Sequence, residues 1–345
     1  MTQPNPPSAA IIGAGLSGLC CARSLQDAGF RVRLFDKSRG VGGRMATRRT
    51  DHGVFDHGAQ YFTARDPRFR AMVAQWVAQG AAAPWTPALV AIDMASGAPV
   101  RSAVGEGTTR HVGVPTMNRI ARLLAEGLDI RTGSTVVAAR RGPASGGQLQ
   151  WTVDAVDGEG AALAPEGGFD WLVAAMPSPQ AATLLGDVPA LQAGARSLPM
   201  VPCWAVLATF DAPLDAGFDA AFVNGSPLTW IARNGAKPGR DTARECWVLH
   251  AARDWSESML EAPAEAVCAR MLEAFRRITG AATAPAIARA HRWRYSGPGA
   301  TTDLTCLFDA QGGAGACGDW LAGARVEGAC LSGLELAGRI LAAAR

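Results

Sequence analysis

The sequence predicts an α/β protein in which a Rossmann-like, dinucleotide-binding domain is combined with a second domain built on a mainly antiparallel sheet. Three observations predict this fold class: a β-α-β pattern with a Gly-x-Gly-x-x-Gly loop near the N-terminus, aromatic strands after residue 180, and a final helix rich in small and aliphatic residues. At 345 residues the chain is long enough to form two domains.

The β-α-β pattern occupies residues 9–36. Residues 9–12 form a short apolar strand, a helix is expected over residues 16–28 with Gly29 in the stop position, and residues 31–35 alternate as a second strand. This second strand delivers Asp36 to its carboxyl end. Strands alternating with helices favour a parallel sheet.

The first glycine cluster has the spacing of a dinucleotide-binding loop. Gly13 permits the tight turn, Gly15 lets the backbone approach a pyrophosphate, and Gly18 lets the helix pack closely on the strand. The helix N-terminus offers free N–H groups to the phosphates. Asp36 lies 18 residues after Gly18, where an acid that binds ribose is expected. These residues together predict a bound dinucleotide.

Further elements follow along the chain. A helix is expected over residues 115–128, and three strands over residues 134–140, 148–156 and 170–175, whose turn-rich separations suggest a small meander before the chain returns to the main sheet. Aromatic strands and a helix over residues 263–279 characterise residues 180–289. We expect a discontinuous cofactor-binding domain and a substrate domain, the former comprising residues 1–64, 113–180 and 290–345 and the latter residues 65–112 and 181–289.

The composition is that of an ordinary globular protein. Hydrophobic residues make up 48% and charged residues 18% of the chain, which argues against disorder. The net charge of +3 and the lack of a Lys/Arg-rich run argue against a nucleic-acid partner. No apolar run approaches the ~20 residues of a membrane helix. We therefore expect neither a nucleic-acid nor a membrane partner.

The cysteines and the N-terminus favour a cytoplasmic location. Eight cysteines are present without a Cys-x-x-Cys pair, and Cys20 and Cys21 are neighbours within a predicted helix. This pattern is typical of buried thiols in a reducing compartment and not of a disulfide framework or a zinc site. The N-terminus shows no basic segment followed by an apolar one. We expect a soluble, cytoplasmic protein without a bound metal.

A second glycine cluster, "SRGVGGRM" at residues 38–45, distinguishes between the two common dinucleotides. A domain that binds NAD alone does not need this loop after the ribose-binding acid, whereas the pyrophosphate and isoalloxazine of FAD extend beyond the first turn. Gly42 and Gly43 let backbone amides approach the flavin side, and Arg39 and Arg44 can offset phosphate charge. The loop therefore predicts resident FAD. The chain here resembles flavoproteins of the amine-oxidase and phenol-hydroxylase type.

Four later segments narrow the resemblance to the bacterial renalases, a family of FAD-dependent oxidoreductases related to flavin amine oxidases. They read "DHGAQYFTARDPRF" at residues 56–69, "WVLHAARDWS" at 247–256, "AHRWRY" at 290–295 and "CGDWLAGARVEGACLSG" at 317–333. The likeness spans residues 9–333. It implies non-covalent FAD in a phenol-hydroxylase-type fold. It also implies oxidation of isomeric dihydro-NAD(P), of the 2- and possibly the 6-dihydro form, to NAD(P)+, with O2 reoxidising the flavin to give H2O2.

The resemblance and the glycine clusters give a set of candidate site residues. For the substrate pocket these are Tyr61, His250, His291 and Trp293, with Trp293 able to stack on a nicotinamide ring. Arg65, Arg292 and Arg294 are candidates for the substrate's phosphates. The residues expected to bind FAD are Gly13, Ala14, Gly15, Ser17, Gly18, Asp36, Lys37, Arg39, Gly40, Gly43, Arg44, Met45, Gly58, Ala59, Gln60, Tyr61, Val136, Gly318, Asp319, Arg325, Val326, Glu327, Gly328 and Ala329.

Within this set, residues 325–329 are expected to open the last helix, with its N-terminus directed at the flavin C2 carbonyl, where its dipole stabilises negative charge. Gly318 and Asp319 resemble the family's second phosphate or ribityl contact. Gly58 to Tyr61 are expected against the isoalloxazine. The expected partners are a small-molecule substrate and O2, and the protein is expected to be a monomer or a weak homodimer.

Three alternatives stay open. Many flavin amine oxidases place a lysine near flavin N5, but here Lys37 lies in the ribose-side loop and Lys237 in the polar turn "NGAKPGR", which counts against a standard amine oxidase. An aromatic hydroxylase would need a route for NAD(P)H to reduce the flavin. A flavin-binding module without turnover is the third. The loss of hydride from a dihydropyridine needs little acid–base help, because the product is aromatic.

Overall fold

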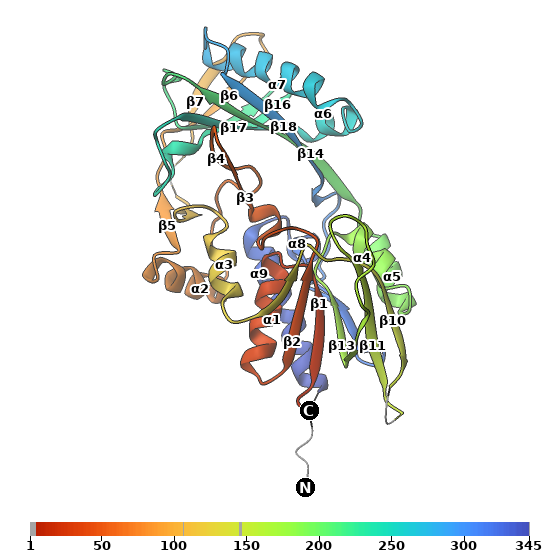
Figure 1. Cartoon of the computed structure of the whole chain (residues 1–345). Coiled ribbons are helices and arrows are strands. Elements are labelled where there is room, and N and C mark those ends of the chain that lie inside the picture. The colour runs from red at the N-terminus through yellow and green to blue at the C-terminus, as the bar shows by residue number, and fades with distance from the viewer. Residues whose placement is uncertain (1–4, 106, 145–146, 345) are drawn as a thin grey trace. The chain divides into compact units, whose positions relative to one another are not determined.

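The computed structural model describes residues 5–105, 107–144 and 147–344, and its contacts group the chain into two units (Figure 1). Unit 1 comprises Met1–Gly43, Ala121–Met200 and Gly297–Arg345. Unit 2 comprises Arg44–Ile120 and Val201–Ser296. Each unit has its own core and its own main sheet.

The unit boundaries fall at other places than the expected domain boundaries. Residues 44–64 group with unit 2 because the hairpin of β3 (Thr47–Thr50) and β4 (Gly53–Asp56) packs against β17 (Glu245–Ala251). Residues 181–200 group with unit 1 because α4 (Ser178–Leu184) and α5 (Pro189–Arg196) bury apolar side chains in its core. Such tertiary contacts leave no mark in local sequence.

Unit 1 contains the expected parallel sheet. Its strand order is β19-β20-β13-β1-β2-β9, and every pair is parallel except β19–β20. The strands are β1 (Ser8–Ile12), β2 (Arg31–Asp36), β9 (Asp129–Thr132), β13 (Trp171–Ala174), β19 (Leu307–Asp309) and β20 (Ala314–Ala316). A separate antiparallel sheet, the expected meander, consists of β10 (Thr135–Pro143), β11 (Leu149–Val156) and β12 (Glu166–Phe169).

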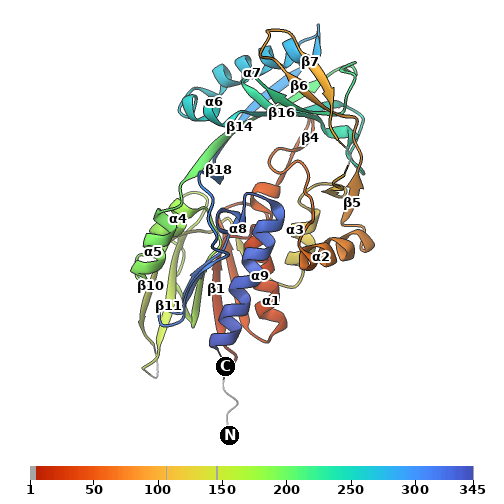
Figure 2. The same cartoon turned by 180° about the vertical axis from the view of Figure 1, so that it is seen from behind.

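Two helices of unit 1 come from opposite ends of the chain and pack on each other. They are α1 (Leu16–Asp27) and α9 (Val326–Ala343), which lie side by side in both views (Figures 1 and 2). The approach is close at Gly333, where a Cβ atom would clash with the carbonyl of Ser17. The short α8 (Asp319–Ala322) precedes α9. The apolar face of α1 therefore depends on the last helix for its burial.

Unit 2 contains the expected, mainly antiparallel sheet. Its strand order is β18-β14-β17-β16-β15-β6-β7, and the pair β15–β6 is parallel. In addition to β17, the sheet contains β6 (Leu89–Asp93), β7 (Val100–Ala103), β14 (Met200–Phe210), β15 (Ala220–Asn224), β16 (Leu228–Arg233) and β18 (Ile287–Pro298). The other elements are η1 (Gly43–Met45), η2 (Asn234–Ala236), α2 (Pro67–Ala78), the strand pair β5 (Ala82–Trp85) and β8 (Arg110–Gly113), α6 (Arg253–Ser258) and α7 (Ala264–Thr279).

The two faces of this sheet have different neighbours. Helix α7 covers one face of the sheet (Figure 1). Its Met271 and Phe275 pack in one core with Trp247 of β17. Because side chains alternate along a strand, Val248 and His250 point to the other face, where Val248 packs against Phe55 of β4. The segment that follows β4 therefore runs along the face opposite α7.

A buried carboxylate fixes the start of that segment. The Asp56 side chain is fully buried and accepts hydrogen bonds from Arg240 (Nη2 at 2.6 Å, Nε at 3.0 Å) and from the backbone N of Met117 (3.0 Å). Lys237 Nζ lies 3.6 Å from the same carboxylate. Burial by itself would raise the pKa of Asp56, but the neighbouring Lys237 and Arg240 lower it below the ordinary value.

The same contacts explain why the helix expected from residue 115 is shorter. Helix α3 spans Arg119–Ala125, while residues 115–118 form a turn. In that turn the carbonyl of Pro115 accepts a hydrogen bond from Arg240 and the amide of Met117 donates one to Asp56. These backbone groups are committed to the buried carboxylate and its partner, so the helix begins after them.

Lys237 lies in the expected turn, but its side chain is buried, which the polar sequence of the turn did not indicate. Its Nζ donates to Oε1 of Gln60 (3.1 Å) and to Oδ1 of Asn234 (3.3 Å). Burial lowers the pKa of Lys237 to about 8, although Asp56 opposes this shift. The lysine is therefore a part of the buried network and not a solvated turn residue.

We expect Asp56→Asn to lower the free energy of unfolding by about 3–5 kcal/mol, because Lys237 and Arg240 would keep their charges in a buried site without a carboxylate. The control is Glu257→Gln, which breaks the exposed pair with Arg253 and is expected to cost less than about 1 kcal/mol. Equilibrium urea unfolding of both variants measures the difference. Equal small losses would contradict the interpretation.

Candidate functional site

In the first glycine cluster of unit 1, two glycines are required by close backbone packing, and a third borders open space. A Cβ at Gly13, where φ is +112°, would clash with the backbone of Ala175, and a Cβ at Gly18 would clash with the carbonyl of Gly13. A Cβ at Gly15 would meet nothing within 4 Å. Gly15 caps α1 with a φ of −73°, which suits any residue. The free space at Gly15, at the N-terminus of α1, fits a pyrophosphate.

The second glycine cluster lies directly beside the first. The N–H of Gly42 donates to the carbonyl of Ala14 (2.9 Å), and Gly15 and Gly42 form a parallel bridge. Gly43 has a φ of +52°, and a Cβ there would lie 3.4 Å from the Cα of Gly15. Both clusters therefore border the same space at the start of α1, as expected for one extended dinucleotide.

Asp36 ends β2 and holds the glycine loop. One carboxylate oxygen accepts from the amide of Ala14 (2.7 Å) and the other from the amide of Ser38 (2.7 Å). The side chain is buried. The carboxylate thus orders the two backbone segments that flank the space beside Gly15. Its bond to ribose stays a prediction.

The other candidate cofactor residues of unit 1 lie in five places. Ser17 belongs to the first turn of α1; Lys37, Arg39 and Gly40 lie on the exposed turn after β2; Val136 is a half-buried residue of β10; and Gly318 and Asp319 are at the start of α8. Helix α9 begins at Val326 with Arg325 as its cap, so residues 325–329 do open the last helix. Their contacts with a cofactor stay predictions.

In unit 2, backbone and side-chain hydrogen bonds hold residues 58–61 in place. The amide of Ala59 donates to the carbonyl of Arg44 (2.9 Å), which ties η1, with Arg44 and Met45, to this segment. The Gln60 amide group donates to the carbonyls of Asp56 and Gly58 and accepts from Lys237. With both ends of its side chain engaged, Gln60 has a fixed orientation.

Three of the four candidate substrate residues, His250, His291 and Trp293, lie close to His57, the residue directly before this segment. The carbonyl of His57 accepts from Trp293 Nε1 (3.0 Å) and lies 3.1 Å from His250 Nε2. The His57 ring centre lies 4.9 Å from that of Trp293 and 4.8 Å from that of His291. We call His57, His250, His291 and Trp293 the histidine cluster.

The imidazoles of this cluster favour the neutral form. Burial lowers the pKa of His57 to about 4, with further contributions from His291 and Arg48, and burial also lowers the pKa of His250 to about 4. The pKa of His291 is lowered too, by burial and by Arg48. At neutral pH these rings therefore add no charge to the site.

The fourth candidate, Tyr61, belongs to an aromatic group. Its ring centre lies 5.3 Å from that of Trp230 and 6.3 Å from that of Trp85, and we call these three residues the tyrosine cluster. Two cations border it, because Arg110 Cζ lies 5.4 Å from the Tyr61 ring and Lys237 Nζ lies 5.8 Å from the Trp85 ring.

The two clusters share one face of the sheet. Trp230 of β16 pairs directly with His250 of β17 on one side and with Phe222 of β15 on the other. This row faces away from α7, as Val248 does. The carboxylate bound by Lys237 is that of Asp56, which also pairs with Arg240. With Arg110 and Lys237 beside its rings, this face is aromatic and cationic.

The structure gives Arg292 and Arg294, two of the candidates for the substrate's phosphates, a partner within the protein. Both arginines pair with Glu261 (2.8 and 2.6 Å), and Arg292 lies over the ring of Trp204. Alternation along β18 turns them to the face opposite Trp293. Arg65, the third candidate, is exposed just before α2.

Several residues of the site carried no signal in the sequence. His57 lies inside the quoted segment "DHGAQYF" but was not singled out, while Trp85, Arg110 and Trp230 are far apart along the chain. The pairing of β5 with β8 places Trp85 opposite Arg110, the bridge between Phe62 and His111 brings β8 beside Tyr61, and the ring of Trp230 contacts that of Tyr61. Side chains alternate between the two faces of a strand, so the sequence of β18 already predicts that Trp293 points away from Arg292 and Arg294.

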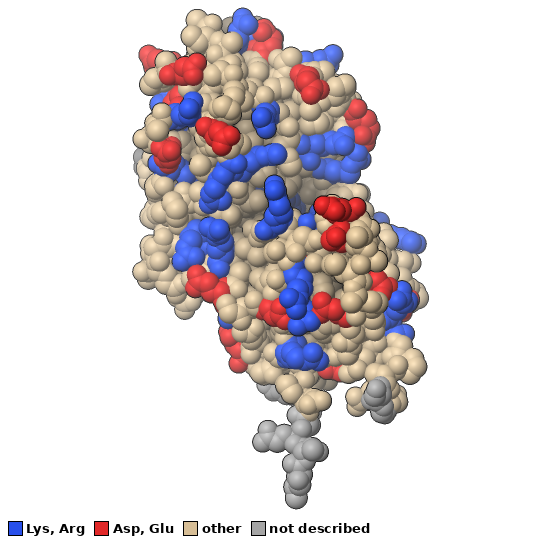
Figure 3. Space-filling model, in the orientation of Figure 1, with Lys and Arg blue, Asp and Glu red and all other residues tan. Residues whose placement is uncertain are grey.

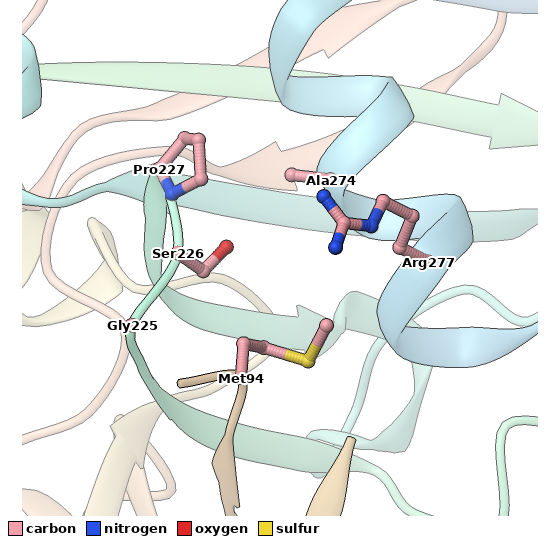
Figure 4. A pocket seen from close by; sticks show the side chains of 6 residues that line it. All are labelled: Met94, Gly225, Ser226, Pro227, Ala274 and Arg277. Carbon is pink, nitrogen blue, oxygen red and sulfur yellow. The ribbon is translucent and has the colours of Figure 1, made fainter. Parts of the chain in front are cut away.

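Unit 2 also has a small crevice away from these clusters (Figure 4). Its volume is about 30 Å³, and it is lined by Met94, Gly225, Ser226, Pro227, Ala274 and Arg277. This space suits a single water molecule. It is too small for a substrate ring.

The surface and the described residues add three observations. In the lower part of the view in Figure 3, acidic and basic side chains lie next to one another. Among residues 5–105, 107–144 and 147–344 no group of His, Cys, Asp or Glu has the arrangement of a metal site. No helix in these same residues is long and apolar enough to cross a membrane.

The fold and the paired glycine clusters define a dinucleotide-dependent oxidoreductase with a Rossmann-like unit. Residues 11–76 match the model of the NAD(P)-binding Rossmann-like domain, and residues 94–341 match that of the flavin containing amine oxidoreductase family. The second match covers more than half of the chain, so the protein belongs to the flavin containing amine oxidoreductase family. FAD is its cofactor, as the second glycine cluster predicted.

Solved structures show the same fold along nearly the whole chain. A candidate protoporphyrinogen oxidase from Exiguobacterium sp. 255-15 has a TM-score of 0.76 and 14% identity, covering 98% of this chain and 99% of that chain. A putrescine oxidase bound to putrescine has a TM-score of 0.72 and 15% identity, again covering 98% and 99%. At these identities the likeness concerns the fold.

Substitution at the two kinds of glycine should separate cofactor binding from packing. We expect Gly15→Ala to leave folding intact but to reduce FAD content by about tenfold or more, because its Cβ would occupy the space beside the pyrophosphate. The matched variant Gly18→Ala should instead lower the free energy of unfolding, by about 1–3 kcal/mol, through its clash with Gly13. Flavin absorbance and urea unfolding provide the two readings. Full flavin content in Gly15→Ala would contradict this assignment.

The buried histidines should make the protein less stable in acid. Since the pKa values of His57 and His250 fall from 6.5 to about 4 on folding, the unfolded chain binds protons first as the pH drops. Their contribution to the free energy of unfolding therefore decreases between about pH 6.5 and 4. We expect His250→Asn to reduce the pH slope in this range by about one proton. An unchanged slope of unfolding free energy against pH would contradict the assignment.

Proposed function

We propose that the protein is a renalase-like, FAD-dependent oxidase of isomeric dihydro-NAD(P), which acts on the 2-dihydro form and extends to the 6-dihydro form. The substrate loses a hydride and becomes NAD(P)+. Bound FAD supplies the group that accepts the hydride and passes the electrons to O2, giving H2O2. The resemblance of four distant segments to the renalases supports this assignment within the family. A cytoplasmic location is part of the same proposal.

The observation that carries this proposal is the character of the sheet face opposite α7. It combines aromatic rings at Tyr61, Trp85 and Trp230 with cations at Arg110 and Lys237. A planar dihydropyridine that bears phosphates matches aromatic rings bordered by positive charge. A protonated amine would be repelled by the same cations.

The residues of this face would bind and orient the substrate ring. Trp293 is held by its hydrogen bond to the carbonyl of His57, so its ring has one orientation for stacking. Gln60 is fixed by Lys237 and the Asp56 carbonyl, and we propose that residues 58–61 lie against the isoalloxazine. Hydride loss forms an aromatic pyridinium, so alignment and exclusion of water supply most of the rate enhancement.

One observation favours the alternative, oxidation of a small amine. The contact of Lys237 with Gln60 brings a lysine to the segment that is expected to meet the flavin. Many flavin amine oxidases use a lysine near flavin N5. The buried pairing of Lys237 with Asp56 argues for a structural role of this lysine. Direct comparison of substrates distinguishes the two functions.

The test uses the purified holoprotein under anaerobic conditions. We expect the yellow flavin absorbance to bleach rapidly with 2-dihydro-NAD(P) or 6-dihydro-NAD(P) and to recover when O2 is admitted, with H2O2 formed in equal amount. Stopped-flow absorbance near the flavin maximum gives the rate. Ordinary NAD(P)H, which carries its hydride at another ring carbon, serves as the matched control and should bleach the flavin far more slowly.

Flavin reduction by amines, compared with reduction by the dihydro isomers, distinguishes the proposed oxidase from an amine oxidase. Bleaching by a primary or secondary amine, without bleaching by the dihydro isomers, would establish the amine oxidase and overturn the proposal. A flavin that no candidate reduces, although dithionite reduces it, would indicate a binding module without turnover.

A further inference from the structure

Two buried hydrogen-bond donors next to Tyr61 have no partner within the described part of the chain. They are Nε of Arg110 and Nε1 of Trp230. Arg110 Cζ lies 5.4 Å from the Tyr61 ring centre, and the Trp230 ring centre lies 5.3 Å from it. Buried donors are nearly always paired, because an unpaired one loses its hydrogen bond to water without replacement.

The chemistry of these donors defines the missing partner. Neither a guanidinium nor an indole N–H can accept a hydrogen bond, so the partner must be an acceptor. A guanidinium matches the two oxygens of a phosphate or carboxylate better than any neutral acceptor. Asp56, which is linked to this network through Lys237, is already bound by Arg240 and Lys237. Since no described residue accepts from either donor, a bound ligand can supply the acceptor.

The surroundings of Arg110 hold it in place for such a ligand. Arg110 is the first residue of β8 and pairs across the strands with Trp85 of β5. Its guanidinium lies over the ring of Tyr61, and Trp85 and Tyr61 contact each other. A guanidinium fixed on an aromatic surface loses little freedom when an anion binds.

We propose that Arg110, assisted by the indole N–H of Trp230, binds an oxyanion of the substrate and selects for substrates that carry one. The inference rests on the proposed function for its choice of anion, which is then a phosphate of the dihydro-NAD(P) isomer. Arg110 replaces Arg292 and Arg294, which face Glu261, as the phosphate-binding arginine of this site.

The first experiment measures binding without turnover. The probe is inorganic pyrophosphate, titrated into the oxidised holoprotein while the fluorescence of the tryptophans is followed. We expect Arg110→Gln to weaken pyrophosphate binding about 10–100-fold and Trp230→Phe to weaken it less, since it removes a neutral donor. Arg101→Gln is the matched control, because Arg101 also lies over an aromatic ring, that of Phe218, but is exposed on β7.

The second experiment separates the phosphate from the ring of the substrate. Anaerobic flavin reduction is measured with 2-dihydro-NAD and with phosphate-free 2-dihydronicotinamide riboside. For Arg110→Gln we expect the dissociation constant of the dinucleotide to rise about 10–100-fold while that of the riboside changes less than about twofold. Arg110→Lys keeps the charge and loses the fork, so an intermediate effect is expected.

The outcomes distinguish failure of the proposed function from failure of the oxyanion site at Arg110. If neither the 2-dihydro nor the 6-dihydro isomer reduces the wild type, but pyrophosphate binds through Arg110, the proposed function fails and the oxyanion site stands. If Arg110→Gln weakens dinucleotide and riboside equally, or neither, the site is overturned. If benzoate, as a carboxylate probe, depends on Arg110 and pyrophosphate does not, the phosphate assignment is overturned. Should Arg110→Gln fold poorly by circular dichroism, Arg110→Lys gives the same comparisons.

Discussion

The site in unit 2 depends on the buried carboxylate of Asp56. It binds Arg240 from the loop after η2, the amide of Met117 from the turn before α3, and Thr47 Oγ1 from β3. The Asp56 carboxylate thus links residues that are far apart along the chain. The segment that begins there carries His57 of the histidine cluster and Tyr61 of the tyrosine cluster, so the order of both clusters depends on this ionic network. A single buried acid between two cations gives a strongly held anchor, because removal of any partner leaves a buried charge.

Unit 1 is held by a constraint of another kind, the close approach of backbone at glycine. A side chain at Gly13 or Gly18 would clash with backbone, whereas a Cβ at Gly15 would meet nothing within 4 Å, and we expect that space to serve the ligand. The carboxylate of Asp36 then holds the backbone of both glycine clusters in position. In these two clusters close backbone contacts set the geometry, and the side chain of Asp36 orders them.

The sequence predicted best what is local. The β-α-β unit, the meander, the mainly antiparallel sheet and the start of α9 all follow from periodicity and glycine placement within short windows. Contacts between distant segments were not visible, which is why the buried state of Lys237 and the contacts of Trp85 and Trp230 with Tyr61 emerged only from the structure. The unit boundaries depend on the same long-range contacts. Trp293 and Arg292 point to opposite faces of β18, and this could have been predicted from the sequence, because side chains alternate along a strand.

The protonation states of the site bear on the kind of reaction it can support. A protonated amine must lose a proton before oxidation, and a base with a pKa near neutrality would be the natural acceptor. The pKa values of His57 and His250, about 4, make these rings weak bases, and Lys237, with a pKa of about 8, is mostly protonated at pH 7 and bound to Asp56. A dihydropyridine, in contrast, needs only to be oriented, because its hydride leaves without a prior proton transfer. Rings that stay neutral, on a face bordered by fixed cations, are suited to that second task.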